Sequence, residues 1–211
     1  MKRTVTLCCV FLTLAAAVRA QEGAAQASRP SPAPAPVKHG GKIETAYDGV
    51  AHETVVALRR MSVTCETAKG SESILRGLCV SLQLTLHCPG QQLEYVRRAT
   101  IRLTFEAKDW DSRHPPGQRD LTAVADGETL RLGRMSLLSH GVSESWLAED
   151  NKETLEVSVP YETFLRLARA DHVELSVGRT AFALRGEVLV ALRDMNTRVL
   201  PPRAPAQAGG N

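Results

Sequence analysis

Residues 78–88, LCVSLQLTLHC, alternate between apolar and polar side chains with a period of two. Successive side chains of a β-strand point to opposite faces of a sheet, so this pattern predicts a strand with one buried face and one solvated face. The apolar set is Leu78, Val80, Leu82, Leu84, Leu86 and Cys88.

The same period marks further strands along the chain. Residues 99–107, ATIRLTFEA, and residues 155–159, LEVSV, alternate cleanly. Residues 55–65 alternate less cleanly, because Arg59 and Arg60 interrupt the pattern and indicate a β-bulge. Half-buried strands therefore account for much of the middle of the chain.

Two hairpins are predicted from their turn residues. Asp126-Gly127 tolerates the positive φ angles of a type I′ turn, and Gly178-Arg179 offers a second turn between two alternating segments. Folding the chain at these points gives each hairpin one apolar face. The expected cross-strand pairs are Ala123 with Leu130, Leu121 with Leu132, Val173 with Leu184, and Leu175 with Phe182.

Helical spacing appears in two segments near the C-terminus. After Pro160, which suits a first helical turn, apolar residues recur on one stripe, and Glu162 and Arg166 are placed to pair on the outside. The two stripes are Tyr161, Phe164, Leu165 and Ala168, and then Val188, Ala191, Leu192, Met195 and Val199. Each predicts a helix that packs on a sheet, although a ligand groove is an alternative interpretation. The expected fold class is α+β, predominantly β: an antiparallel sandwich-like sheet with two short helices near the C-terminus.

The first twenty residues have the three parts of a secretory signal peptide. Lys2 and Arg3 begin it, an apolar run follows, and Val18-Arg19-Ala20 offers a cleavage site before Gln21. The apolar run is shorter than the roughly 20 residues of a membrane span, and we find no later run that could anchor the chain. We therefore expect a soluble protein without a membrane span, periplasmic or secreted after residues 1–20 are removed.

Composition divides the remainder into three parts. Residues 21–41 are Pro-rich and aperiodic and predict a flexible linker. Residues 42–199 are long enough for one β-rich domain with its own core. Residues 200–211 resemble the linker in composition and predict a disordered tail.

The charge balance argues against nucleic acid as a partner. The chain has 26 Lys+Arg and 23 Asp+Glu. Removal of Lys2, Arg3 and Arg19 with the signal peptide leaves 23 of each (26 − 3 = 23). Nucleic-acid-binding domains normally carry a clustered basic surplus, and only 4% of this chain is aromatic.

The C-terminal half resembles a segment of uncharacterised exported bacterial β-rich domain proteins. The resemblance rests on VSVPYETFLRLARADHVELSVGRTAFALRGEVLVALRDM, residues 157–195, and on the opening KIETAYDGVAHETVV, residues 42–56. It is patchy over residues 42–199 and carried by apolar scaffold positions. The group has no established activity, so the resemblance implies export and a β-rich fold but transfers no catalytic residue. Arg185-Gly186 departs from the pattern, because a polar capping residue is expected there.

Few residues carry recognisable chemistry. The sequence HGVSES brings His140 near Ser143 but lacks the glycine that follows the serine of a nucleophile elbow. The richest stretch is KDWDSRHPPGQRD, residues 108–120, in a loop longer than a hairpin needs. Its candidate ligand-binding residues are Asp109, Trp110, Asp111 and His114. The two aspartates could bind a hard cation such as calcium, although the spacing of a calcium loop is absent and ordinary polar loop chemistry explains the same residues.

Three hypotheses of function follow. The first is a non-catalytic envelope or extracellular module that binds a protein, glycan or surface polymer. The second is a metal-dependent or hydrolytic enzyme with a site around loop 108–120. The third is a purely structural domain carried on the Pro-rich arm. No catalytic residue, metal ligand or cofactor is assigned from the sequence, so a binding or structural module is favoured over an enzyme.

Three cysteines follow the signal peptide. Cys79 and Cys88 are separated by nine positions on one predicted strand, roughly 30 Å, so they cannot form a disulfide. Cys65 ends the preceding strand, and in a hairpin it would lie beside Cys79, provided that a bulge aligns the two faces. We therefore expect a Cys65–Cys79 disulfide and a free, buried Cys88. A zinc site formed by all three is the alternative, although no Cys-x-x-Cys spacing supports it.

Overall fold

The computed structural model describes residues 38–65, 78–107, 114–145 and 148–199. Within these ranges a six-stranded antiparallel sheet has the strand order β1-β2-β3-β4-β8-β7. Its strands are β1 (Ile43–Asp48), β2 (Glu53–Cys65), β3 (Leu78–Pro89), β4 (Arg98–Ala107), β7 (Ser136–Ser145) and β8 (Ala148–Pro160). The central pairing of β4 with β8 joins segments that are about fifty residues apart in the chain, as in the pair Thr104 and Thr154.

The second sheet of the described chain has four strands in the order β10-β9-β5-β6. These are β5 (Asp120–Ala125), β6 (Glu128–Arg134), β9 (Val173–Val177) and β10 (Thr180–Leu184). The helices are the 3₁₀ turn η1 (Pro116–Gln118), α1 (Tyr161–Arg169) and α2 (Glu187–Thr197). The predicted fold class, predominantly β with two short helices near the C-terminus, is confirmed.

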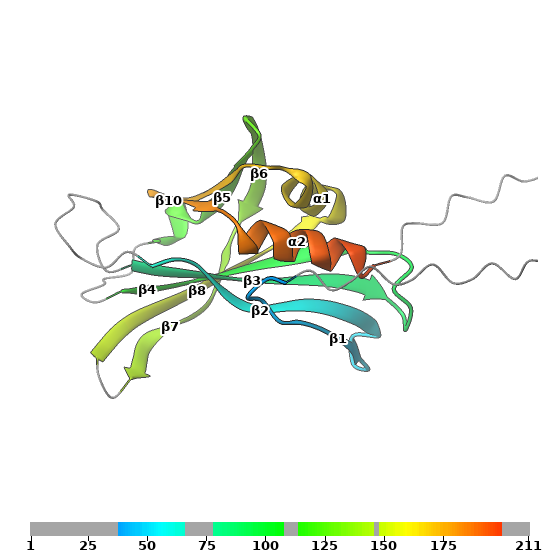
Figure 1. The fold of residues 1–211 in the computed structure, drawn as a ribbon. Coiled ribbons are helices and arrows are strands. Elements are labelled where there is room, and N and C mark those ends of the chain that lie inside the picture. The colour runs from blue at the N-terminus through cyan, green and yellow to red at the C-terminus, as the bar shows by residue number, and fades with distance from the viewer. Residues whose placement is uncertain (1–37, 66–77, 108–113, 146–147, 200–211) are drawn as a thin grey trace, which may run out of the picture. The chain divides into compact units, whose positions relative to one another are not determined.

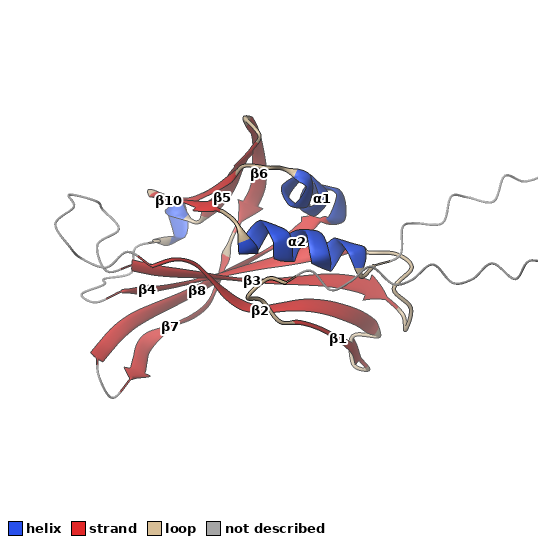
Figure 2. Cartoon of the chain, in the orientation of Figure 1, coloured by secondary structure: helices blue, strands red, loops and turns tan. Residues whose placement is uncertain are grey.

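The four-stranded sheet and the two α-helices lie on the same side of the six-stranded sheet (Figures 1 and 2). Helix α2 contacts β2, α1 contacts β4 and β8, and β10 also reaches β2. The core fills the space between these layers, where the apolar set of β3 predicted from residues 78–88 is buried throughout. No helix or strand among the described residues covers the other face of the six-stranded sheet, which carries polar side chains and is called the open face below (Figure 1).

The two predicted hairpins form, with one correction. The pairs Ala123–Leu130, Val173–Leu184 and Leu175–Phe182 are confirmed. Leu121 pairs with Gly133 instead of Leu132, because the register shifts between Leu121 and Thr122. The predicted Leu121–Leu132 pair is therefore wrong, although both leucines are still buried.

Strand β2 contains the irregularity predicted at Arg59 and Arg60. Its register against β3 shifts between Leu58 and Met61, and again between Ser62 and Thr64. After the second shift Cys65 is the Cα partner of Cys79. The bulges therefore bring into register two positions that a regular hairpin would not align.

In α1, Phe164 and Ala168 of the predicted stripe are buried together with Leu167, while Tyr161 and Leu165 are only partly buried. The second predicted stripe is buried, although its last member, Val199, lies beyond the end of α2. The predicted pairing of Glu162 with Arg166 is wrong, because Arg166 forms an ion pair with Glu128 of β6. Helix α2 begins after Gly186, whose φ is 51° and which has no side-chain cap. The missing polar cap noted in the sequence is therefore a feature of the structure.

Folded structure begins before residue 42. His39 Nε2 lies 3.0 Å from Asp194 Oδ2 of α2, and both side chains are almost completely buried. A Cβ at Gly41 would collide with the side chains of Met61 and Leu58, so the chain passes close to β2 at this point. The last residues of the predicted linker thus belong to the folded unit. None of the helices in the described part of the chain is long and apolar enough to cross a membrane.

Candidate functional site on the open sheet face

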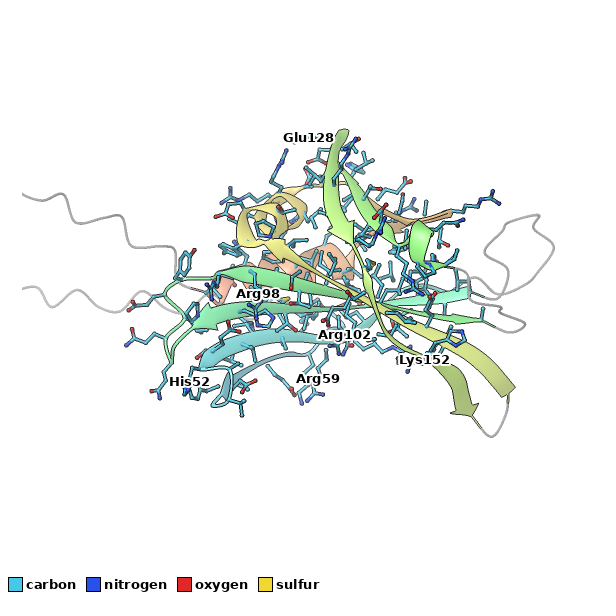
Figure 3. The ribbon with its side chains drawn as sticks, turned by 180° about the vertical axis from the view of Figure 1, so that it is seen from behind. His52, Arg59, Arg98, Arg102, Glu128 and Lys152 are labelled. Atoms are coloured by element: carbon cyan, nitrogen blue, oxygen red, sulfur yellow. The ribbon has the colours of Figure 1, made fainter. Side chains whose placement is uncertain are left out.

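The open face of the six-stranded sheet presents rows of polar side chains that run across neighbouring strands. One row joins Thr85 to Thr100 and Ser158, and the next joins Gln83 to Arg102 and Glu156. These side chains alternate with the buried leucines of β3 and the apolar residues of β4, so the period of two that forms the core also forms this surface. Figure 3 shows Arg59, Arg98, Arg102 and Lys152 along this face.

A groove of about 610 Å³ lies on this face and extends from β1 to β8. Three arginines, two glutamates, a histidine and several neutral hydrogen-bonding groups line it. The lining residues are Glu44, Ala57, Leu58, Arg59, Gln83, Thr85, His87, Arg98, Thr100, Arg102, Glu156 and Ser158. Because these residues come from β1, β2, β3, β4 and β8, the groove exists only when these five strands are paired in this order.

A hydrogen-bonded network centred on His87 organises one end of the groove. His87 Nδ1 lies 3.0 Å from Glu53 Oε2, and His87 Nε2 lies 2.9 Å from Thr100 Oγ1. Arg98 Nη2 donates to the same Glu53 oxygen at 3.1 Å. Thr100 Oγ1 in turn lies 3.3 Å from Ser158 Oγ, which extends the network to β8. The network fixes the imidazole and one guanidinium, as expected of side chains prearranged for a ligand.

Ion pairs hold the other two arginines of the groove. Arg102 donates from both Nε and Nη2 to Glu156 Oε2, at 2.9 and 2.7 Å. Arg59 Nη2 lies 2.6 Å from Glu44 Oε2. Hydrogen bonds from Lys42 and from Arg59 lower the pKa of Glu44, so this carboxylate stays ionised in moderately acidic solution.

The structure describes only one of the four candidate residues in loop 108–120. Asp109, Trp110 and Asp111 lie outside the described residues, so their predicted binding role stays a prediction. His114 is completely buried, and its ring lies 4.6 Å from that of Phe105. The histidine is therefore packed between the two sheets and is not displayed in a loop.

His114 has polar partners on both sides of its ring. Nδ1 lies 2.7 Å from Glu153 Oε2, and Nε2 lies 3.2 Å from Thr180 Oγ1. A hydroxyl, an imidazole and a carboxylate in this order resemble a nucleophilic relay. All three side chains are buried, however, and an attacking hydroxyl must reach its substrate. The cluster therefore ties β8, β10 and the segment before η1 together as a polar element of the core.

The remaining sequence candidates lie elsewhere. His140 and Ser143 belong to strand β7 and not to a loop, and His140 is exposed. Cys88 is buried and free, and burial, with a smaller contribution from Glu53, raises the pKa of its thiol. No group of three or more His, Cys, Asp or Glu side chains in the described residues is arranged to hold a metal ion.

Sequence reasoning missed the open face as a site. The polar positions of residues 78–88 and 99–107 were visible, but each strand alone indicates only a solvated face. The groove results from the order β1-β2-β3-β4-β8, and this order cannot be deduced from the alternation. The charged positions Arg98, Arg102 and Glu156 on adjacent strands were the available signal.

Comparison with known proteins assigns no family to this arrangement. No protein-family model, curated protein or solved structure matches the chain.

Proposed function

We propose that this protein is an exported, soluble, non-catalytic module that binds an envelope or extracellular ligand in the groove on the open face of its six-stranded sheet. The observation that carries the proposal is the groove itself: about 610 Å³, lined by charged and neutral hydrogen-bonding side chains from five strands. Ion pairs and the His87 network hold these side chains in place before any ligand arrives. Such preorganisation reduces the entropy that binding costs.

Export is supported by the sequence and by one feature of the register. Residues 1–20 have the parts of a secretory signal peptide. Cys65 and Cys79 are directly opposed on β2 and β3, which favours a disulfide in an oxidising compartment such as the periplasm or the exterior. The resemblance to exported bacterial β-rich domain proteins points to the same location.

Two measurements test the two parts of the proposal. Fractionation followed by N-terminal sequencing should find the protein outside the cytoplasm, beginning at Gln21. A cytoplasmic protein that retains Met1 would contradict export.

Binding is tested by affinity recovery of ligands from the envelope fraction. The wild-type protein is compared with a variant that carries Arg98→Gln and Arg102→Gln in the groove. We expect the wild-type protein to retain a ligand that the variant loses. Equal recovery by the two proteins would place binding elsewhere, for example at residues 108–113, or would leave a purely structural role.

A further inference from the structure

On the open sheet face, the negatively charged side chains are less exposed to solvent than the positively charged ones. The four carboxylate side chains in its ion pairs are mostly shielded from solvent: Glu53 is 11% exposed, Glu106 and Glu156 are each 26% exposed, and Glu44 is 33% exposed. Their lysine and arginine partners are more exposed, from 37% for Lys152 to 75% for Lys42. Although the formal charges nearly balance, the surface that a ligand meets is cationic.

Neutral hydrogen-bonding groups lie between these cations. Gln83, Thr85, Thr100 and Ser158 line the groove, and they provide both donors and acceptors. Ser81, Thr104 and Thr154 lie beside the groove on the same strands but are buried, so the neutral groups that a ligand can reach are those of the groove lining itself. A ligand that is complementary to the groove lining therefore carries hydroxyl groups as well as negative charge.

The composition of the groove argues against other macromolecules. Interfaces between proteins normally have an apolar or aromatic core, and the groove contains no aromatic side chain apart from His87. Single-stranded nucleic acids need aromatic platforms for their bases, and these are also absent from the groove lining. A hydroxyl-rich polyanion remains the best match in chemistry.

We propose that the groove binds an acidic polysaccharide, an extended chain that carries carboxylates among free hydroxyls. This inference rests on the proposed binding function and names its ligand class. The exposed guanidiniums of Arg59, Arg98 and Arg102 bind the carboxylates, and the threonine, serine and glutamine side chains bind the hydroxyls. From β1 to β8 the groove crosses four strand intervals, roughly 19 Å, which suits a chain of several sugar units.

The experiment measures binding of the purified protein to three soluble polymers by calorimetry. Polygalacturonate carries carboxylates and hydroxyls, dextran carries hydroxyls alone, and polyglutamate carries carboxylates alone. We expect polygalacturonate to bind most tightly and to weaken as salt is raised, because exposed charges are screened. Dextran binding as tight as polygalacturonate binding, or polyglutamate binding as tight, would overturn the inference.

Matched double variants locate the site. Arg59→Gln with Arg102→Gln removes two groove cations and should weaken polygalacturonate binding on the order of tenfold or more. The control, Arg131→Gln with Arg134→Gln, makes the same change in net charge on exposed positions of β6 and should leave binding unchanged. An equal loss in both variants would mean non-specific attraction and would overturn the inference.

Failure of this inference is distinguishable from failure of the proposed function. If polygalacturonate does not bind, but the groove variant loses a different ligand from the envelope fraction, the groove is a binding site and only its ligand class is wrong. If neither polygalacturonate nor any other ligand depends on the groove, both proposals fail.

Discussion

At the scale of single residues, His114 shows how a polar side chain can be misread from sequence. It lies in a segment rich in Asp, Pro and Gly, and such composition predicts an exposed loop. The structure places it between the sheets, against Phe105 and between Glu153 and Thr180. Its partners are 39 and 66 positions away in the chain, so no local pattern could have indicated them.

His114→Ala should destabilise the protein by about 3 kcal/mol, because it opens a cavity and removes the hydrogen bond to Glu153 Oε2. Glu153 Oε1 has no hydrogen-bond partner among the described residues, and Arg119 Nη2 is 3.9 Å away, so the substitution would leave the buried carboxylate without a hydrogen bond from His114 or Arg119. Urea unfolding measures the effect. The matched control is His140→Ala on exposed β7, with an expected change within about 0.5 kcal/mol. Equal effects of the two substitutions would show that His114 is not packed in the core.

The cysteines give a second prediction at this scale. Peptide mapping without reductant should find a Cys65–Cys79 disulfide, since these residues are Cα partners, and should find Cys88 reduced. Because burial raises the pKa of Cys88, its thiol should resist alkylation until the protein is unfolded. Recovery of a peptide that links Cys88 to either other cysteine would contradict the register of β2 and β3.

At the scale of elements, local patterns predicted strands, turns and helices well. The alternation of residues 78–88 and the turn at Asp126-Gly127 depend on neighbours in the chain, and both are found as expected. The assignment of strands to the two sheets was not predicted, because alternation shows that one face of a strand is apolar but not which strand lies beside it. The same limit explains Arg166, which pairs with Glu128 across two elements. The groove needs five strands in the correct order, so it was the least predictable feature.

The β5–β6 turn allows a direct test of backbone conformation. Asp126 and Gly127 have φ values of 48° and 86°, in the left-handed region. Gly127→Ala should cost about 1 kcal/mol, because a Cβ is disfavoured there even though no atom lies within 4 Å of it. Gly117 has similar open space without a positive φ, so Gly117→Ala serves as the control and should be nearly neutral. Equal effects on thermal unfolding would contradict the type I′ turn.

At the scale of the whole molecule, Asp194 connects the beginning of the folded unit to its end. Burial alone would raise the pKa of Asp194, but hydrogen bonds from His39 and Arg198 outweigh it, and the pKa is lowered. A lowered carboxyl pKa stabilises the fold above the unfolded value, near 3.9, and this stabilisation is lost as pH falls through the folded value. Acid should therefore loosen the contact between the two ends.

Asp194→Asn should reduce stability by about 2 kcal/mol at pH 7, and its difference from the wild-type protein should shrink below about pH 4. Unfolding in guanidinium chloride at several pH values measures the loss of stability at pH 7 and its decrease at lower pH. Asp171→Asn is the control, because Asp171 also pairs with an arginine of α2 but is 81% exposed. A difference at Asp194 that stays constant from pH 7 to pH 3 would contradict the assigned pKa shift.

The contact between His39 and Asp194 also has a consequence for the architecture of larger proteins. Because 155 residues separate two side chains that touch, the folded unit enters and leaves at nearly one place. A unit with adjacent ends can be inserted into a loop of a host protein, or cut open elsewhere and rejoined end to end, with little strain on the rest of the fold. The proposed binding face consists of β1, β2, β3, β4 and β8, so it is kept when the break or the insertion lies outside these strands. The adjacent ends of the folded unit therefore make it suited to insertion into another protein and to circular permutation.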